Sequence, residues 1–100
     1  MDLKNNYIVE LIKNNITLFE LFDRVYLFGS VLEDDKEPND VDILLIYCEY
    51  TDKTTQEINR VSNCLEHLLG ISVDLTVLSM EEEKDVQFLN RIKPPVLELK

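Results

Sequence analysis

Glycine, proline and cysteine are scarce in this sequence, and tryptophan is absent. Two glycines and three prolines in 100 residues exclude a collagen-like or linker-like chain. Two cysteines, Cys48 and Cys64, are too few and too scattered for a disulfide framework, so we expect reduced thiols that serve as small core residues. The longest strongly apolar block, residues 43–48, is far shorter than the roughly 18 residues of a membrane span. We therefore expect no association with a membrane.

Basic residues are also scarce relative to acidic ones. Ten lysines and arginines stand against twenty aspartates and glutamates, which gives a net charge of −10. This charge repels phosphate backbones and argues against general nucleic-acid binding. It suits a basic partner protein or a site that collects divalent cations. The N-terminus lacks the basic flank and apolar stretch of a secretory signal, so we expect a soluble protein in the cytoplasm.

The hydrophobic content of 45% is sufficient for a core, and the length predicts one domain, residues 1–100. Apolar spacing and capping patterns predict an N-terminal helix with Tyr7 in its apolar stripe, and further helices over residues 54–69 and 79–91. Apolar runs between turn signals predict strands over residues 25–28, 40–47 and 71–78, a short edge strand over residues 96–99, and a polar loop over residues 33–39. The strand 40–47 is apolar on both faces, which is typical of a central strand. We expect an α+β (α/β-like) fold, with a small mixed β-sheet of three to four strands packed with helices.

Three aspartates carry the most specific chemical signal. Asp40 and Asp42 lie two residues apart on the predicted central strand, so both side chains point to the same face. Two carboxylates on an otherwise apolar strand are costly unless something neutralises them. Asp74 lies on the following strand and completes a group of three if the two strands are neighbours. Carboxylate oxygens are the ligands that Mg²⁺ prefers, together with water and substrate phosphates.

The pair Gly29-Ser30 ends the strand that precedes these aspartates, and nine residues separate Ser30 from Asp40. Glycine lets backbone N–H groups approach a phosphate closely, and the serine hydroxyl adds a donor. Each feature alone has a structural explanation, such as a strand-entry turn for Asp40 or a solvent-facing position for Asp74. The combination instead predicts a metal-assisted phosphoryl or nucleotidyl transfer site.

At these residues the sequence resembles the DNA polymerase β-like nucleotidyltransferases, and in particular their minimal single-domain MNT branch. The resemblance implies a Mg²⁺-dependent enzyme that transfers a nucleoside monophosphate, AMP from ATP, to a hydroxyl group. Asp40, Asp42 and Asp74 would then be the metal ligands and catalytic residues, and Gly29 and Ser30 would bind the nucleotide triphosphate. In this family a common partner is a HEPN-domain toxin, which the nucleotidyltransferase modifies as an antitoxin.

The sequence departs from the family pattern directly after Gly29-Ser30. Family members usually continue with a small residue and an arginine, whereas this chain continues with Val31-Leu32-Glu33. The departure favours an alternative, a catalytically degenerate module of the same fold that neutralises a partner by contact. A third hypothesis is a metal-dependent phosphate-ester hydrolase that uses the same carboxylates. The sequence leaves the acceptor, the nucleotide preference and the oligomeric state open.

Overall fold

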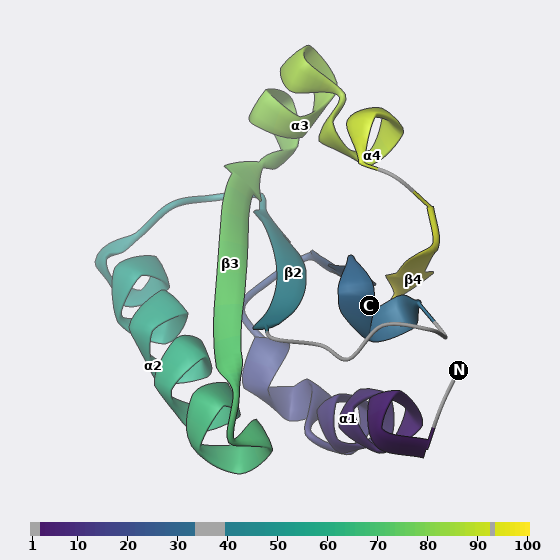
Figure 1. The fold of residues 1–100 in the computed structure, drawn as a ribbon. Helices are drawn as coiled ribbons and strands as arrows, with labels where there is room; N and C mark the ends of the chain where they lie inside the picture. Colours follow the sequence, from purple (N-terminus) through teal and green to yellow (C-terminus); the bar gives the residue numbers. More distant parts are fainter. Residues whose placement is uncertain (1–2, 34–39, 93) are drawn as a thin grey trace.

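The computed structural model describes residues 3–33, 40–92 and 94–100, which form a four-stranded mixed sheet with helices on both faces (Figure 1). The helices are α1 (Leu3–Asn14), α2 (Asp52–Leu69), α3 (Met80–Val86) and α4 (Phe88–Arg91), with 3-10 turns η1 (Ile16–Phe19) and η2 (Ser30–Leu32). The strands are β1 (Arg24–Phe28), β2 (Asp40–Tyr47), β3 (Ser72–Ser79) and β4 (Val96–Glu98). This confirms the predicted α+β fold. Within these ranges no helix is long and apolar enough to cross a lipid bilayer.

The strands lie in the order β3-β2-β1-β4. β2 pairs antiparallel with β1 and parallel with β3, and β4 pairs antiparallel with the other side of β1. β2 is therefore an interior strand, as its two-sided apolar pattern predicts. β3 and the short β4 form the two edges of the sheet.

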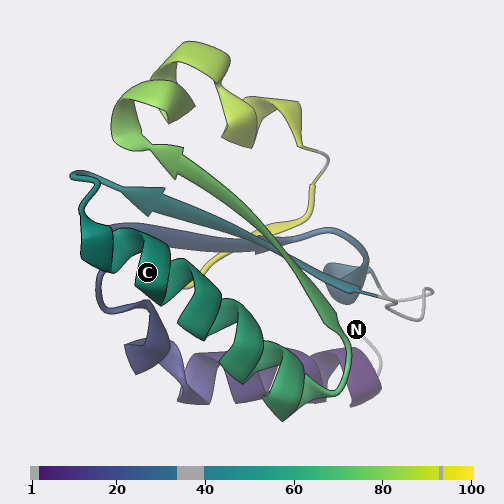
Figure 2. The same cartoon turned by 90° about the vertical axis from the view of Figure 1, so that its left-hand side faces the viewer.

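Helices α1 and α2 cover one face of the sheet (Figure 2). The odd-numbered residues of β2 point to this face, because alternate residues of a strand share a side. Val41, Ile43 and Leu45 are fully buried there. The helices bury their own apolar stripes against them, with Ile8, Val9 and Ile12 from α1 and Val61 and Leu65 from α2. This is the main hydrophobic core.

Helices α3 and α4 pack on the opposite face, over the C-terminal half of β2. A second cluster forms there from Tyr26, Leu44 and Ile46, with partly buried Phe28, Leu78, Met80, Phe88 and Leu89 packed against it. The N-terminal half of β2 presents Asp40 and Asp42 on this same face, by the same alternation. The face is thus divided along β2 into an apolar half under the helices and a carboxylate half.

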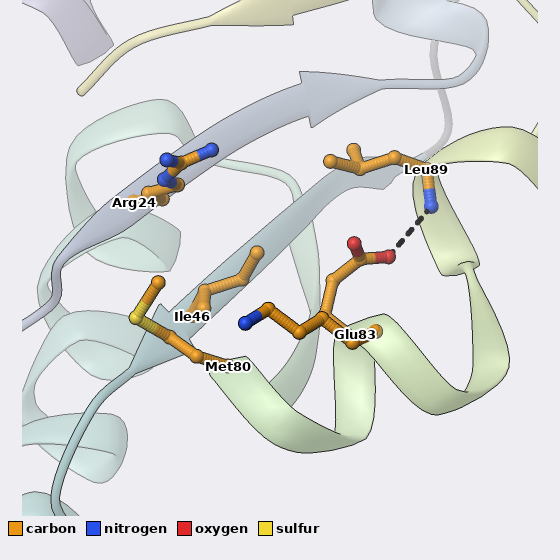
Figure 3. Close-up of a pocket in the computed structure, with 6 residues that line it drawn as sticks. Arg24, Ile46, Met80, Glu83 and Leu89 are labelled. Atoms are coloured by element: carbon orange, nitrogen blue, oxygen red, sulfur yellow. Dashed lines mark hydrogen bonds between the residues drawn. The ribbon is translucent and has the colours of Figure 1, made fainter.

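A small cavity lies in the apolar half, between the sheet and α3 and α4 (Figure 3). Arg24, Ile46, Met80, Glu83 and Leu89 line it, and the Leu89 amide donates a hydrogen bond of 3.1 Å to Glu83 Oε2. Its volume is 110 Å³, whereas ligand pockets typically measure about 300–1,000 Å³. We interpret it as a packing gap at the base of α3 and α4.

Two predicted helix boundaries are wrong. Helix α2 begins at Asp52, because Thr51 is its N-cap and forms the capping box with Thr54, rather than Thr54 with Glu57. The predicted helix 79–91 is interrupted at Gln87, whose φ of 51° is left-handed and ends α3. This reversal sets Phe88 edge-on against Phe28, with ring centroids 5.7 Å apart. A tertiary contact therefore accompanies a break that no local sequence signal marks.

Three residues that the sequence predicts to be buried are exposed in the structure. Tyr7 is 65% exposed, and Val9, at 2%, lies in the core in its place. Cys48 and Cys64 are both exposed free thiols, rather than small core residues. Residues 34–39 of the predicted loop lie outside the described residues.

Replacing Ser79 with alanine is expected to lower the free energy of unfolding by about 1 kcal/mol, a typical cost for a lost N-cap. Ser79 Oγ accepts from the Glu82 amide at 3.0 Å, and Glu82 Oε1 accepts from the Ser79 amide at 2.9 Å. These bonds hold the pKa of Glu82 below its ordinary value of 4.5. The contribution of the Glu82 carboxylate is therefore present above pH 4.5 and is lost as the pH falls through the folded-state pKa.

Thermal melts of the wild type, Ser79→Ala and Glu82→Gln across this pH range measure these effects. Ser79→Ala retains the backbone amide that donates to Glu82, so Glu82→Gln is the variant that removes the carboxylate. The difference in Tm between the wild type and Glu82→Gln should shrink as the pH falls below 4.5. Ser62→Ala, within α2, is the matched control and should lower Tm little, because alanine is the better helix former. A Glu82→Gln penalty that is the same at all pH values would contradict the carboxylate contribution.

Candidate functional site

The parallel pairing of β2 with β3 brings the three predicted aspartates together. Asp42 on β2 lies opposite Asp74 on β3. Asp40 precedes Asp42 by two residues, so its side chain is the next one along the same face of the sheet. One carboxylate oxygen from each residue lies within 4.8 Å of the other two. Asp40 and Asp42 are half-buried and Asp74 is exposed. The three aspartates that the sequence predicts as metal ligands therefore come together in the fold.

Burial and neighbouring carboxylates disfavour the charged forms of Asp42 and Asp74. Burial, followed by repulsion from Asp40 and Asp74, raises the pKa of Asp42 above its ordinary value. A hydrogen bond with the Asp40 carboxyl, followed by repulsion from it, raises the pKa of Asp74. The site therefore favours bound positive charge, either as protons or as a cation.

The donor set fits a divalent cation of the hard, oxygen-preferring kind. Mg²⁺ is usually held by one or two carboxylates, with water and substrate phosphates completing the octahedron. Asp40 and Asp42 enter from one strand and Asp74 from its neighbour, so the ligands are held by the sheet rather than by a loop. Two of the three ligands lie on β2, which is interior and is hydrogen-bonded on both sides.

Gly29 packs directly against the carboxylate of Asp42. Its φ of 84° and ψ of −157° belong to a backbone region that is open essentially to glycine alone. A Cβ at this position would collide with Asp42 Oδ2 and would lie 3.2 Å from Asp42 Cγ. Phe28, the last residue of β1, pairs with Asp42 across the sheet, which explains the closeness. The glycine therefore leaves room for a carboxylate.

The residues after Gly29 turn back into the main core. Ser30 begins η2, and its carbonyl accepts the Glu33 amide at 3.0 Å. Val31 is fully buried and Leu32 packs against the main core cluster. The two apolar residues that depart from the family pattern therefore have a packing role. Glu33, which lies near the position of the usual arginine, is half-buried.

Sequence reasoning assigned Gly29 to phosphate approach and missed its contact with Asp42. The signal was nevertheless available. A Gly-Ser pair that ends one strand, followed by an Asp-x-Asp strand, predicts that the two meet if the strands pair as neighbours. Gly29 does lie beside Asp42 in the fold, directly after β1, and Ser30 follows it at the start of η2. The roles of all five predicted site residues remain predictions.

Comparison with known families gives one match over most of the chain. A family model described as polymerase beta, nucleotidyltransferase, matches residues 6–94. A search of curated proteins finds no significant match to the sequence.

Solved structures give similarities of fold. A candidate nucleotidyltransferase from Sulfolobus solfataricus has a TM-score of 0.53 at 22% identity, covering 83% of this chain and 76% of that one. The MntA–HpeT toxin–antitoxin structure, in a mutant form, has a TM-score of 0.56 at 21% identity, over 96% and 72% of the two chains. A complex of the tri-AMPylated HEPN toxin of Shewanella oneidensis with its MNT antitoxin gives 0.51 at 22% identity, over 98% and 70%.

Proposed function

Because the chain belongs to the polymerase beta nucleotidyltransferase family, we propose that it transfers AMP from ATP to a hydroxyl group in a Mg²⁺-dependent reaction. The observation that carries the proposal is the convergence of three carboxylates within 4.8 Å, beside a strand end that only glycine can occupy. Clustered carboxylates and a backbone conformation restricted to glycine both lower stability, and a protein of this fold that bound no metal here would need neither.

In this reaction the acceptor hydroxyl oxygen bonds to the α-phosphorus of ATP, the bond to the β-phosphate oxygen breaks, and pyrophosphate leaves. Asp40 and Asp42 would hold Mg²⁺, and Asp74 would help to hold it and would take the hydroxyl proton. A bound Mg²⁺ would supply positive charge to the triphosphate and to the developing charge of the transition state. Gly29 and Ser30 would hold the triphosphate through backbone N–H groups and a hydroxyl. Catalysis would come from positioning and electrostatics.

A HEPN-domain toxin is the proposed acceptor protein, with this chain as its antitoxin. Two solved structures of similar fold are toxin–antitoxin structures, and one of them contains an AMPylated HEPN toxin. The net charge of −10 suits a basic protein partner better than a nucleic acid. Both observations support the assignment, which depends on the family.

A catalytically degenerate binding module is the second candidate. It is favoured by the composition of residues 29–33, where no basic side chain is available to the triphosphate and Glu33 adds negative charge. Such a chain would keep the fold and would neutralise its partner by contact. The two candidates differ in whether the carboxylates still bind Mg²⁺ with ATP.

Isothermal titration of ATP, with and without Mg²⁺, separates these candidates. The active protein should bind ATP at least about tenfold more tightly with Mg²⁺, and Asp42→Asn should abolish that dependence. Asp85→Asn on α3 removes one exposed carboxylate away from the site and should leave it intact. Absence of ATP binding in the wild type, alone and with a HEPN protein added, would favour the degenerate module.

A further inference from the structure

β3 is an open edge of the sheet. It pairs with β2 on one side, and within the described ranges no strand pairs with its other side. In Figure 1, β3 lies in front of β2, and no labelled helix or strand lies in front of β3. β3 has eight residues, whereas the opposite edge strand β4 has three and follows Pro94-Pro95. Short strands and prolines protect edges from pairing with other chains, so β4 is protected and β3 is not.

Two hydrogen bonds show which backbone groups of β3 face outward. The Val73 amide donates to Glu66 Oε2 at 3.0 Å, and the Ser79 amide donates to Glu82 Oε1 at 2.9 Å. Both acceptors are side chains of helices, so these amides point away from β2. Alternate residues of a strand direct their backbone N–H and C=O groups to the same side. The backbone N–H and C=O groups of Leu75 and Val77 therefore also point away from β2.

The outward-facing amides of β3 differ in whether they have a hydrogen-bond acceptor. The chain satisfies the first and the last with its own carboxylates, and within the described residues no hydrogen bond is found for the Leu75 and Val77 amides on that side. Two donors and their neighbouring carbonyls therefore form a short, unpaired stretch in the middle of a regular strand. This is the arrangement that accepts an added strand in β-augmentation.

Charge indicates what kind of strand fits. Glu66 and Glu82 lie at the two ends of the stretch, and the exposed Asp74 lies beside it. An open hollow at the start of β3 is lined by Glu66, Gly70, Ile71 and Ser72. A second copy of this chain would bring the same carboxylates against one another, on a protein of net charge −10. Cationic side chains would instead be complementary at each of these positions.

We propose that β3 is a docking edge for an extended, cationic segment of a partner protein, which adds as a fifth strand through the backbone groups of Leu75 and Val77. The added strand lies next to β3, so one of its side chains is adjacent to Asp74 on the carboxylate face. A hydroxyl residue at that position is delivered to the three carboxylates. This last step depends on the proposed function, whereas the docking does not, since it requires neither ATP nor Mg²⁺.

Hydrogen exchange of individual backbone amides, measured by NMR on the whole chain, tests the docking. Without a partner, the Leu75 and Val77 amides should exchange much faster than the Thr76 amide, which faces β2. The probe is the basic heptapeptide Lys-Val-Ser-Val-Lys-Val-Lys, blocked at both ends. Its addition should slow exchange at Leu75 and Val77 by at least about tenfold, since exchange then requires opening of the new pair.

Two altered peptides serve as controls and leave the protein unchanged. One copy is N-methylated at the alternate residues whose N–H groups would face β3, so it lacks those backbone donors. It should bind at least about tenfold more weakly, since each lost hydrogen bond is worth about 1 kcal/mol. A copy with glutamate in place of lysine should not bind. Val77→Pro removes one outward N–H and should also weaken binding, because proline is tolerated where the N–H of an edge strand faces outward.

Several outcomes would overturn the proposal. They are equal binding of the N-methylated peptide, no protection of either amide by the basic peptide, or a dimer in ultracentrifugation that Val77→Pro dissociates. Protection at Leu75 and Val77 without any AMP transfer to the peptide serine would support the docking and count against the proposed acceptor delivery. Transfer without protection of these amides would support the proposed function and overturn the docking.

Discussion

Asp42→Asn is expected to reduce nucleotidyl transfer by at least about 10³-fold, because it removes a charge that metal-assisted transfer requires. Asp42 is the central carboxylate of the three: it is opposite Asp74, two residues from Asp40, and in contact with Gly29. Asparagine keeps the shape and one oxygen, so the packing around Gly29 is preserved. The measurement is transfer of labelled AMP from ATP to a HEPN-domain acceptor, at fixed Mg²⁺.

The same substitution is expected to stabilise the metal-free protein. Burial and the two neighbouring carboxylates raise the pKa of Asp42 above its ordinary value of 3.8. A raised carboxyl pKa means that the folded state binds protons more strongly, so this residue lowers stability as the pH rises from 3.8 through the folded-state pKa. At neutral pH the Asn variant should therefore melt a few degrees higher, since about 1 kcal/mol corresponds to about 4–8 °C in a domain of this size.

Melting curves with and without Mg²⁺ complete this test. Added Mg²⁺ should raise the Tm of the wild type more than that of Asp42→Asn, because binding to the folded state stabilises it. The advantage of the variant should vanish below pH 3.8, where the wild-type carboxyl is protonated in both states. Asp85→Asn should change neither the transfer rate nor the response to Mg²⁺. An unchanged transfer rate in Asp42→Asn would remove this residue from the mechanism.

Gly29→Ala is expected to lower stability strongly and to disrupt the site, more than the same substitution at Gly70. The new Cβ would collide with Asp42 Oδ2 at a backbone φ of 84° that disfavours every other residue. The cost combines about 1–3 kcal/mol of backbone strain with the collision, so we expect a Tm lower by more than about 10 °C. ATP binding should be lost as well, because Asp42 must move from the other two carboxylates to make room.

Gly70→Ala is the matched control for Gly29→Ala. Gly70 also has a positive φ, of 72°, but a Cβ there would meet no atom within 4 Å. It caps α2 in the left-handed conformation, so alanine should cost only about 1–2 kcal/mol of strain, with ATP binding unchanged. Equal losses of stability in both variants would show that backbone strain alone, rather than contact with Asp42, explains the requirement for Gly29.

The fold class and most element positions could be predicted because they depend on local patterns. The predicted bounds of β2 agree with the observed ones. A run of residues that is apolar on both faces of the strand and begins at a polar residue can be recognised from neighbouring residues alone. The Ser79–Glu82 capping box and the Gly70 cap were also predicted correctly, because each depends on residues within one helical turn. The break at Gln87 was not, because it accompanies the packing of Phe88 against Phe28 from a distant strand.

Local sequence patterns are sufficient to identify the residues that can form the site: two aspartates on one face of a central strand, a third aspartate on the next strand, and a Gly-Ser strand end. Whether these residues meet depends on the order and register of the strands in the folded sheet. The convergence depends on β3 pairing parallel to β2 in the register that sets Asp74 opposite Asp42, and strand pairing across such a separation is fixed by the burial of α2 against both strands. The same pairing leaves β3 at the edge of the sheet, because a parallel crossover through α2 covers a face of the sheet and not its edge.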